Sequence, residues 1–190
     1  MLIGITGPAG SGKTTAANYL VKNHGFIHLK FAGSLKAMVR TLLVDMGVSV
    51  EHQMEMIEGD EKENTQGWLN GKTPRHAMQT LGTEWGRKCM GEDFWVNVAQ
   101  QRVMSEHEQC SSITVPRILF DDVRFENEAA MIRNMGGTIV HMTGRGGIEG
   151  SHASEGGVAR INDDCGLANN GGIDDVYHAM NQILNWITDE

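Results

Sequence analysis

The residues best suited to chemistry lie close to the start of the chain, in the run GPAGSGKT at residues 7–14. Gly7, Gly12, Lys13 and Thr14 match the pattern G-x-x-x-x-G-K-[ST], whose glycines let backbone N–H groups surround phosphate oxygens. The lysine of this pattern reaches the β- and γ-phosphates, and the hydroxyl that follows it is a Mg²⁺ ligand. We therefore expect ATP and Mg²⁺ to bind here, with Thr14 on the metal. The residues expected to hold the nucleotide are Gly10, Ser11, Gly12, Lys13, Thr14 and Thr15.

The elements on either side supply the context that such a P-loop requires. Residues 2–6 form a short apolar run typical of a strand, and residues 13–23 predict a helix that Gly25 ends. The N-terminus of that helix would present its positive end to the same phosphates. A strand before the motif and a helix after it distinguish a P-loop from a chance glycine-rich turn.

A second cluster of charged residues follows another apolar run. Ligands of open α/β sheets bind at the carboxyl ends of the strands, where Asp122 and Arg124 fall. Asp122 is expected to position an acceptor or to order Mg²⁺ and its waters, and Arg124 to bind a phosphate through two hydrogen bonds. Glu128, one helical turn on, is expected to orient that guanidinium or to bind acceptor hydroxyls. A solvated charged turn is the alternative, and it is our prediction for Asp121 and Glu126.

Strands and helices alternate at both ends of the chain, which predicts an α/β protein with a mainly parallel sheet in one domain, residues 1–190. The predicted strands are residues 2–6, 26–29, 117–121 and 138–142. The predicted helices are residues 13–23, one that Ser34 caps, 74–90, 94–104, 125–135 and 173–187. Residues 51–72 are polar and predict helix plus loop.

Composition and net charge limit the kinds of molecule that the protein is expected to bind. The chain has 24 acidic and 16 basic residues, a net charge of −8, which disfavours broad nucleic-acid binding. We find no run long enough for a membrane span and no signal peptide. Cys89, Cys110 and Cys165 are widely spaced and predict free thiols in a reducing cytosol. We expect a cytoplasmic protein that binds small molecules, with neither nucleic acid nor membrane as a partner; its oligomeric state stays open, a homodimer included.

Taken together, the motifs resemble those of the phage-type deoxynucleoside monophosphate kinases, which are related to other P-loop nucleoside monophosphate kinases and to phosphomevalonate kinases. The resemblance spans about residues 4 to 180. Besides the P-loop, the segments that carry it are Phe31–Lys36, Thr73–Arg75, Gln79–Arg87, Asp93–Trp95, Asp122–Glu128 and His152–Glu155. The chain departs from the family pattern at Gly33-Ser34 and in the extra acid Asp121.

The resemblance implies a P-loop NTPase fold of three layers, α/β/α, around a mainly parallel five-stranded sheet. It also implies an acceptor-binding helical insert at about residues 34–92 and a lid at about residues 144–164. The implied reaction is transfer of the γ-phosphoryl group of ATP to a deoxynucleoside 5′-monophosphate. The alternatives are a P-loop kinase for another phosphorylated acceptor, such as phosphomevalonate or dephospho-coenzyme A, and a nucleotide-binding regulatory ATPase.

The same resemblance assigns further site residues. It implies that Arg75 grips the acceptor phosphate, that Trp95 stacks on the acceptor base and that Asn169 lies near the adenine of ATP. Lys36 would reach the phosphates, with a helix surface as the alternative, and Trp95 has a core position as its alternative. Arg145 would close from the lid onto the transferring phosphoryl group. The expected catalytic residues are Lys13, Asp122, Arg124 and Arg145.

Overall fold

The computed structural model describes residues 1–110, 115–144 and 158–189. These residues form two compact units. Unit 1 comprises Met1–Phe31 and Ala99–Glu190, and unit 2 comprises Ala32–Val98, which includes the whole of the predicted insert at 34–92. Residues 145–157, with Arg145, His152 and Glu155 of the predicted lid, lie outside the described residues.

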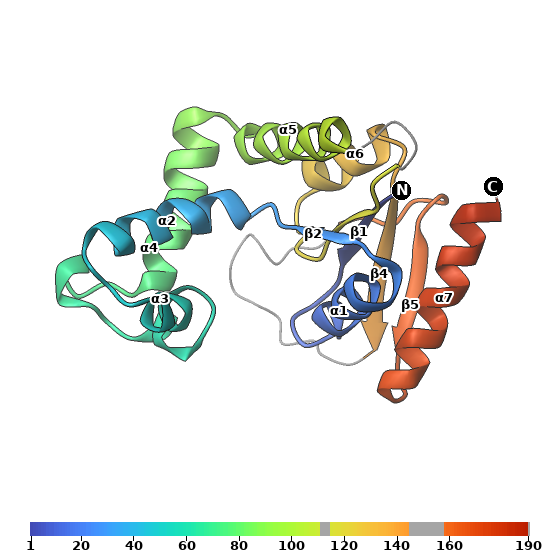
Figure 1. The fold of residues 1–190 in the computed structure, drawn as a ribbon, viewed down its shortest axis with the longest axis horizontal. Coiled ribbons are helices and arrows are strands. Elements are labelled where there is room, and N and C mark those ends of the chain that lie inside the picture. Colours follow the sequence, from blue (N-terminus) through green and yellow to red (C-terminus); the bar gives the residue numbers. More distant parts are fainter. Residues whose placement is uncertain (111–114, 145–157, 190) are drawn as a thin grey trace. The chain divides into compact units, whose positions relative to one another are not determined.

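Unit 1 is built on a parallel sheet of five strands within the described residues, in the order β2-β3-β1-β4-β5 (Figure 1). The strands are β1 (Leu2–Thr6), β2 (Ile27–Leu29), β3 (Ile118–Phe120), β4 (Thr138–Gly144) and β5 (Cys165–Asn169). The central strand, β1, leads directly into the P-loop. The segments that follow β3 and β4, its two neighbours, therefore emerge on either side of that loop.

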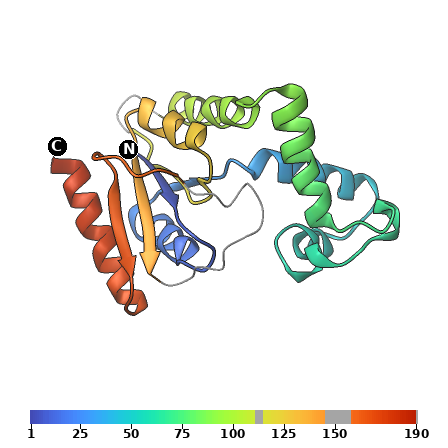
Figure 2. The same ribbon diagram turned by 180° about the vertical axis from the view of Figure 1, so that it is seen from behind.

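Helices cover both faces of this sheet (Figures 1 and 2). The helices of unit 1 are α1 (Lys13–His24), the larger part of α5 (Phe94–Gln109), α6 (Glu126–Asn134) and α7 (Ile173–Asp189). α1 and α7 pack on one face and on each other, whereas α6 packs against β1 and β4 from the other face. This three-layer α/β/α arrangement confirms the predicted fold class. Among the described residues, no helix is both long and apolar enough to cross a bilayer.

The position of β1 in the core explains its unbroken apolar sequence. All five of its residues are buried, as expected for a strand with helices on both faces. Ile3 and Ile5 face α1 and α7. Gly4 faces α6, where an added Cβ would lie 2.6 Å from the side chain of Ile132. Glycine at this position therefore lets α6 approach the sheet closely.

Unit 2 is built mainly of helices around a small core of Val39, Leu43, Met56 and Ile57. Its elements are α2 (Gly33–Asp45), α3 (Val50–Ile57), the 3₁₀ helices η1 (Asp60–Glu63) and η2 (Gly67–Leu69), α4 (Pro74–Thr80), the π-helix η3 (Leu81–Met90) and the start of α5. The predicted start at Pro74 is confirmed, with the Thr73 hydroxyl accepting a hydrogen bond from the N–H of His76.

Two predictions about elements were wrong, and one strand was not predicted. Ser34 does not cap α2, which begins at Gly33 without a side-chain cap. The helix predicted at 74–90 changes into the π-helix η3 at Leu81, in the stretch that contains two glycines, which are poor helix formers. Strand β5 was not predicted, because glycine and alanine interrupt its apolar pattern.

Candidate active site

The P-loop backbone adopts a conformation that favours glycine. Gly7, Gly10 and Gly12 have φ angles of 145°, 76° and 98°, which side-chain-bearing residues rarely adopt. Space adds a second constraint, because a Cβ on Gly12 would lie 2.6 Å from the side-chain amide of Asn169. A loop of this kind between a strand and a helix N-terminus forms a concave, N–H-lined surface suited to anions.

Lys13, the first residue of α1, folds back over this loop. Its Nζ donates to the carbonyl oxygens of Gly7, at 2.7 Å, and Pro8, at 2.8 Å. Burial lowers the pKa of Lys13, the positive charge of Arg124 lowers it further, and the negative charge of Asp121 opposes both effects. Lys13, Arg124 and Asp121 are therefore close enough to interact electrostatically.

The rest of the motif fits a nucleotide phosphate. The side chain of Ser11 is completely buried, and its hydroxyl has no hydrogen-bond partner among the described residues. A buried hydroxyl without a partner is costly, so a ligand oxygen at this position would be stabilising. Thr14 is exposed and Thr15 half-buried in the first turn of α1, which leaves the Thr14 hydroxyl accessible to a metal ion.

Asn169, the last residue of β5, supports the loop from the neighbouring strands. Its side chain is buried, and its amide donates a hydrogen bond of 2.9 Å to the carbonyl oxygen of Ser11. This contact attaches β5 to the phosphate-binding backbone. Proximity of Asn169 to the adenine of ATP stays a prediction.

Asp121, directly after β3, was predicted to be solvated, and that prediction was wrong. Its side chain is only 5% exposed, with Oδ1 at 2.8 Å from Nε2 of His28 and 3.8 Å from Nζ of Lys30. Nε2 of His28 and Oδ1 of Asp121 form no hydrogen bond with a described residue, so the contact between them is electrostatic. Burial alone would raise the pKa of Asp121, but His28 and Lys30 outweigh burial and hold it below the usual value.

Asp122 and Glu128 fix the backbone around Arg124. Asp122 Oδ1 accepts a hydrogen bond of 3.0 Å from the N–H of Phe31, which joins the segments that follow β2 and β3. The buried carboxylate of Glu128 accepts hydrogen bonds from the backbone N–H groups of Arg124, at 2.8 Å, and Phe125, at 3.1 Å. Glu128 therefore caps α6 and holds the chain at Arg124. Its predicted contact with acceptor hydroxyls stays a prediction.

The guanidinium of Arg124 is available to a ligand. The residue is exposed, and among the described residues its side chain forms neither a hydrogen bond nor an ion pair. Glu128 holds the backbone of Arg124, and the positive charge of Arg124 lies within electrostatic reach of Lys13 in the P-loop. A planar guanidinium held in this way can bind two oxygens of one phosphate.

In unit 2, the two cations predicted to bind the acceptor are paired with carboxylates. Lys36 Nζ lies 2.7 Å from the carboxylate of Glu58, and Arg75 Nε pairs with Glu63. The Arg75 and Glu63 side chains are both exposed, so their pair is worth little and can exchange for another anion.

Trp95 is held inside unit 2. Its side chain is 4% exposed, and its Nε1–H donates a hydrogen bond of 2.8 Å to the carbonyl oxygen of Gly82. The indole lies so close to Gly86 that a Cβ there would collide with it. Both glycines belong to the Gln79–Arg87 motif and lie in π-helix η3, so part of that motif holds Trp95 in place. Stacking of Trp95 on a base stays a prediction, and it would require the ring to become accessible.

Comparison with known proteins decides the family. The family described as deoxynucleotide monophosphate kinase matches residues 48–180. A protein of Acanthamoeba polyphaga mimivirus named "Putative deoxynucleotide monophosphate kinase" is 32% identical over 189 residues, covering 93% of this chain and 92% of that protein. The chain belongs to the deoxynucleotide monophosphate kinase family. It is a kinase, a phosphotransferase whose family implies the use of ATP, and the resemblance predicted from its motifs is confirmed.

Solved structures support the fold of this kinase. The crystal structure of TT1252 from Thermus thermophilus aligns with a TM-score of 0.52 at 19% identity, covering 98% of this chain and 97% of that chain, which shows similarity of fold alone. A crystal structure of a sugar kinase from Janibacter sp. HTCC2649 aligns with a TM-score of 0.44 at 13% identity, covering 98% of this chain and 94% of that chain.

Residues 158–164, which follow the undescribed part of the kinase's predicted lid, are anchored to the sheet by a charged cluster. Asp164, whose carboxylate is 1% exposed, accepts hydrogen bonds from the Arg133 guanidinium, at 2.7 and 3.1 Å, and from the N–H of Ile161, at 3.0 Å. His141 Nε2 lies 2.9 Å from the same carboxylate. Burial raises the pKa of Asp164, but Arg133, the N–H of Ile161 and His141 together hold it below its usual value.

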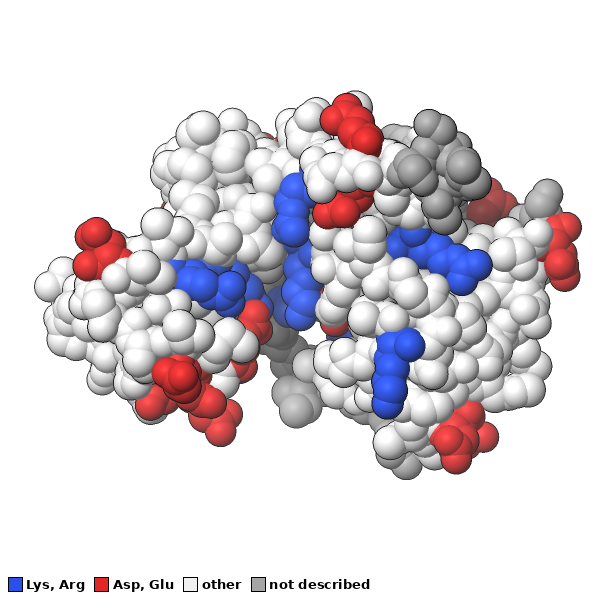
Figure 3. Space-filling model, viewed as in Figure 1, with Lys and Arg blue, Asp and Glu red and all other residues white. Residues whose placement is uncertain are grey.

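Elsewhere on the kinase, charges of both signs share the surface. Figure 3 shows Lys and Arg side chains at several separate places on one face, interspersed with acidic side chains. Glu126, predicted to be solvated, is confirmed as an exposed partner of Arg133.

Sequence reasoning missed Asp121 and His28. The position of Asp121 could have indicated a role, because it directly follows a fully buried strand at the edge of the sheet where ligands bind. His28 had no local signal. It reaches Asp121 through the pairing of β2 with β3, in which His28 is aligned with Leu119.

Proposed function

We propose that this kinase transfers the γ-phosphoryl group of ATP to a deoxynucleoside 5′-monophosphate, giving ADP and the diphosphate. The observation that carries the proposal is the electrostatic proximity of Lys13 to Arg124 and Asp121 in a P-loop that is already formed. The acceptor phosphate is ionised near neutral pH, so the reaction needs no strong general base. Catalysis then depends on positioning and on stabilising charge.

The donor half of the reaction belongs to unit 1. The P-loop N–H groups and the Ser11 hydroxyl bind phosphate oxygens, and Lys13 exchanges the carbonyl oxygens of Gly7 and Pro8 for the β- and γ-phosphates. Thr14 would hold Mg²⁺, which would supply positive charge to the triphosphate when bound. Arg124 binds the transferring phosphoryl group. Because Arg124 and Lys13 repel each other, the buried carboxylate of Asp121 offsets the cost of holding two cations together.

The acceptor half uses the cations of unit 2. Arg75 exchanges Glu63 for the acceptor phosphate, and Lys36 exchanges Glu58 for phosphate oxygens. Arg75 does so at low cost because its pair is exposed. Asp122 positions the acceptor from the end of β3, and Arg145 from the lid stabilises charge in the transition state. We further propose a cytoplasmic enzyme acting on free nucleotides, which its net charge of −8 supports.

A coupled assay of ADP release tests this function. The purified chain with Mg-ATP is assayed against all four deoxynucleoside monophosphates, the ribonucleotides, phosphomevalonate and dephospho-coenzyme A. We expect at least one deoxynucleoside monophosphate to raise the rate well above that without acceptor. No response to any of them, while a control kinase responds under the same conditions, would contradict the proposal. ATP hydrolysis that no acceptor stimulates would instead indicate a regulatory ATPase.

A further inference from the structure

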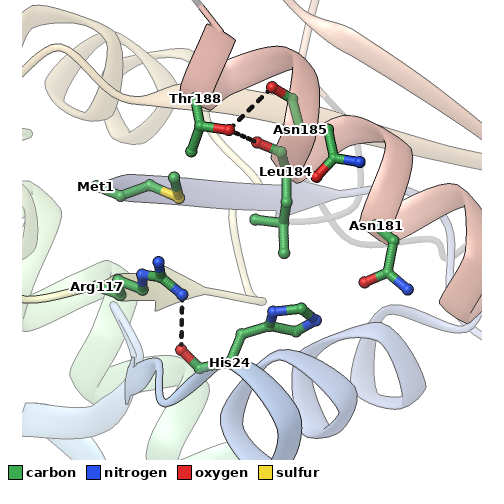
Figure 4. Close-up of a pocket in the computed structure, with 7 residues that line it drawn as sticks. All are labelled: Met1, His24, Arg117, Asn181, Leu184, Asn185 and Thr188. Atoms are coloured by element: carbon green, nitrogen blue, oxygen red, sulfur yellow. Dashed lines mark hydrogen bonds between the residues drawn. The ribbon is translucent and has the colours of Figure 1, made fainter.

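A pocket of about 440 Å³ lies at the edge of the unit 1 sheet where the strands begin (Figure 4). It is formed by the residues just before β1 and β3, by the end of α1 and by the last turns of α7. Its lining residues are Met1, His24, Arg117, Asn181, Leu184, Asn185 and Thr188. The P-loop follows the opposite end of β1, so the pocket is separate from the proposed ATP site.

The charges around this pocket favour an anion. Arg117 is exposed and donates one hydrogen bond, of 3.2 Å, from Nη1 to the carbonyl oxygen of His24. The lining contains no acid, and in the described part of the chain no carboxylate forms an ion pair with Arg117. An unpaired guanidinium in a concave, acid-free site is unexpected in a chain with a net charge of −8. Its remaining donors suit the oxygens of a phosphate or carboxylate.

A second polar group in the pocket also lacks a partner. Nε2 of His24 is buried and makes no hydrogen bond among the described residues. The His24 ring packs edge-on against Tyr19, and the Tyr19 hydroxyl is hydrogen-bonded to Asn181. These contacts hold the His24 ring in place. Figure 4 shows the His24 ring and the Arg117 guanidinium bordering the same space. A histidine ring beside an arginine offers an anion more hydrogen-bonding groups than a single surface arginine does.

The rest of the lining suits the body of a small molecule. Leu184 contributes an apolar surface, and Asn185 is exposed, with an amide that can both donate and accept hydrogen bonds. The volume is within the usual range of small-molecule sites. We propose that this pocket binds a phosphate-bearing small molecule, with the phosphate at Arg117 and His24 and the remainder against Leu184 and Asn185.

Titration of the ¹⁵N-labelled full chain, followed by NMR, tests the proposal. One arm uses inorganic phosphate and the other dAMP, so that a free phosphate is distinguished from a phosphate carried on a larger body. We expect saturable shifts at residues 24–25, 117 and 181–188 in at least one arm. Arg117→Gln should weaken this binding about tenfold or more, because it removes charge-assisted hydrogen bonds. Signals of the P-loop, residues 10–15, should titrate as before, and Arg102→Gln on α5 serves as a matched control.

A second variant keeps the test independent of Arg117. Asn185→Asp places a negative charge in the pocket at an exposed position, so the fold should be preserved while phosphate binding weakens. Saturation by phosphate alone would assign the site to free phosphate, and tighter binding of dAMP would assign it to a larger ligand. The proposal is overturned if no pocket signal saturates in either arm, or if both pocket variants bind as the wild type does. Because the P-loop signals are observed separately, this result does not depend on the kinase reaction.

Discussion

The two units hold their functional cations in different ways. In unit 1, Lys13 rests on backbone carbonyl oxygens and Arg124 has no side-chain partner among the described residues, while Asp121 is buried within electrostatic reach of Lys13. In unit 2, Lys36 and Arg75 are each paired with a carboxylate. The donor site is therefore built by backbone geometry before any ligand arrives. In the proposed reaction, Lys36 and Arg75 first exchange a carboxylate for a phosphate, and this exchange costs little where the ion pair is exposed.

This contrast also separates two uses of a motif. The P-loop glycines shape a surface for a ligand, whereas Gly82 and Gly86 of the other specific motif receive the side chain of Trp95. Sequence specificity alone does not distinguish a ligand contact from a packing contact.

The largest effect is expected from Lys13→Ala. If the donor site works through preorganised charge, kcat should fall by about 10²- to 10³-fold, because a donor aimed at the transferring phosphoryl group is lost. The melting temperature should change little, since Lys13 bonds only to loop carbonyls, one partly buried and one exposed, and is not in the core. Steady-state kinetics and thermal unfolding measure the two quantities. Lys22→Ala, at an exposed site on the same helix, is the control, and an equal loss of activity and stability in Lys13→Ala would indicate a structural role instead.

The next largest effect is expected on stability, where a buried ion pair of unit 1 is compared with an exposed ion pair of unit 2. Asp164→Asn should lower the free energy of unfolding by about 3 kcal/mol, because it removes the charge that the half-buried Arg133 pairs with. Glu63→Gln, in the exposed pair of unit 2, should change it by less than about 0.5 kcal/mol. Urea unfolding at neutral pH measures both variants. If the two variants lost similar amounts of unfolding free energy, burial would not account for any difference in strength between these two ion pairs.

The Asp164 effect should also depend on pH. The pKa of this carboxyl in the folded chain is below its ordinary value of about 3.9. Its contribution is therefore complete above that ordinary value and is lost as the pH falls through the lower, folded-state pKa. The stability difference between wild type and Asp164→Asn should shrink as the pH falls below about 4. A difference that stayed constant to the lowest pH at which the protein is folded would contradict the pairing.

A smaller effect is expected from the acceptor cations. Arg75→Ala should raise KM for the deoxynucleoside monophosphate by about tenfold, because charge-assisted hydrogen bonds to its phosphate are lost. KM for ATP should not change. Glu63→Gln, which releases Arg75 from its partner, should leave KM for the acceptor equal or lower. An increase in both KM values on Arg75→Ala would count against a role specific to the acceptor.

Local signals were enough to predict the fold class and the strand, glycine-rich loop and helix of the P-loop. The P-loop, its strand and its helix are adjacent in sequence, and the helix ends at Gly25 as predicted. Asp121 and β5 escaped prediction because their roles depend on residues far away in the sequence. The charge partners of Asp121 are His28, on the neighbouring strand β2, and Lys30, just after that strand, and β5 is a strand because β4 pairs with it. The same limit applies to Asn169, whose amide supports a loop 158 residues earlier in the chain.

The smallest effect tests the packing contact directly. Trp95→Phe keeps an aromatic ring but removes the Nε1–H that bonds to Gly82, so it should lower the free energy of unfolding by about 1 kcal/mol. KM for the acceptor should then change little, because a ring that is 4% exposed has no free face for a base. Trp85→Phe, at a ring that is 36% exposed in the same aromatic group, is the matched control and should have a smaller effect on stability. If Trp95→Phe instead raised KM for the acceptor selectively and left stability unchanged, Trp95 would be the stacking residue, and unit 2 would have to open its core to bind a base.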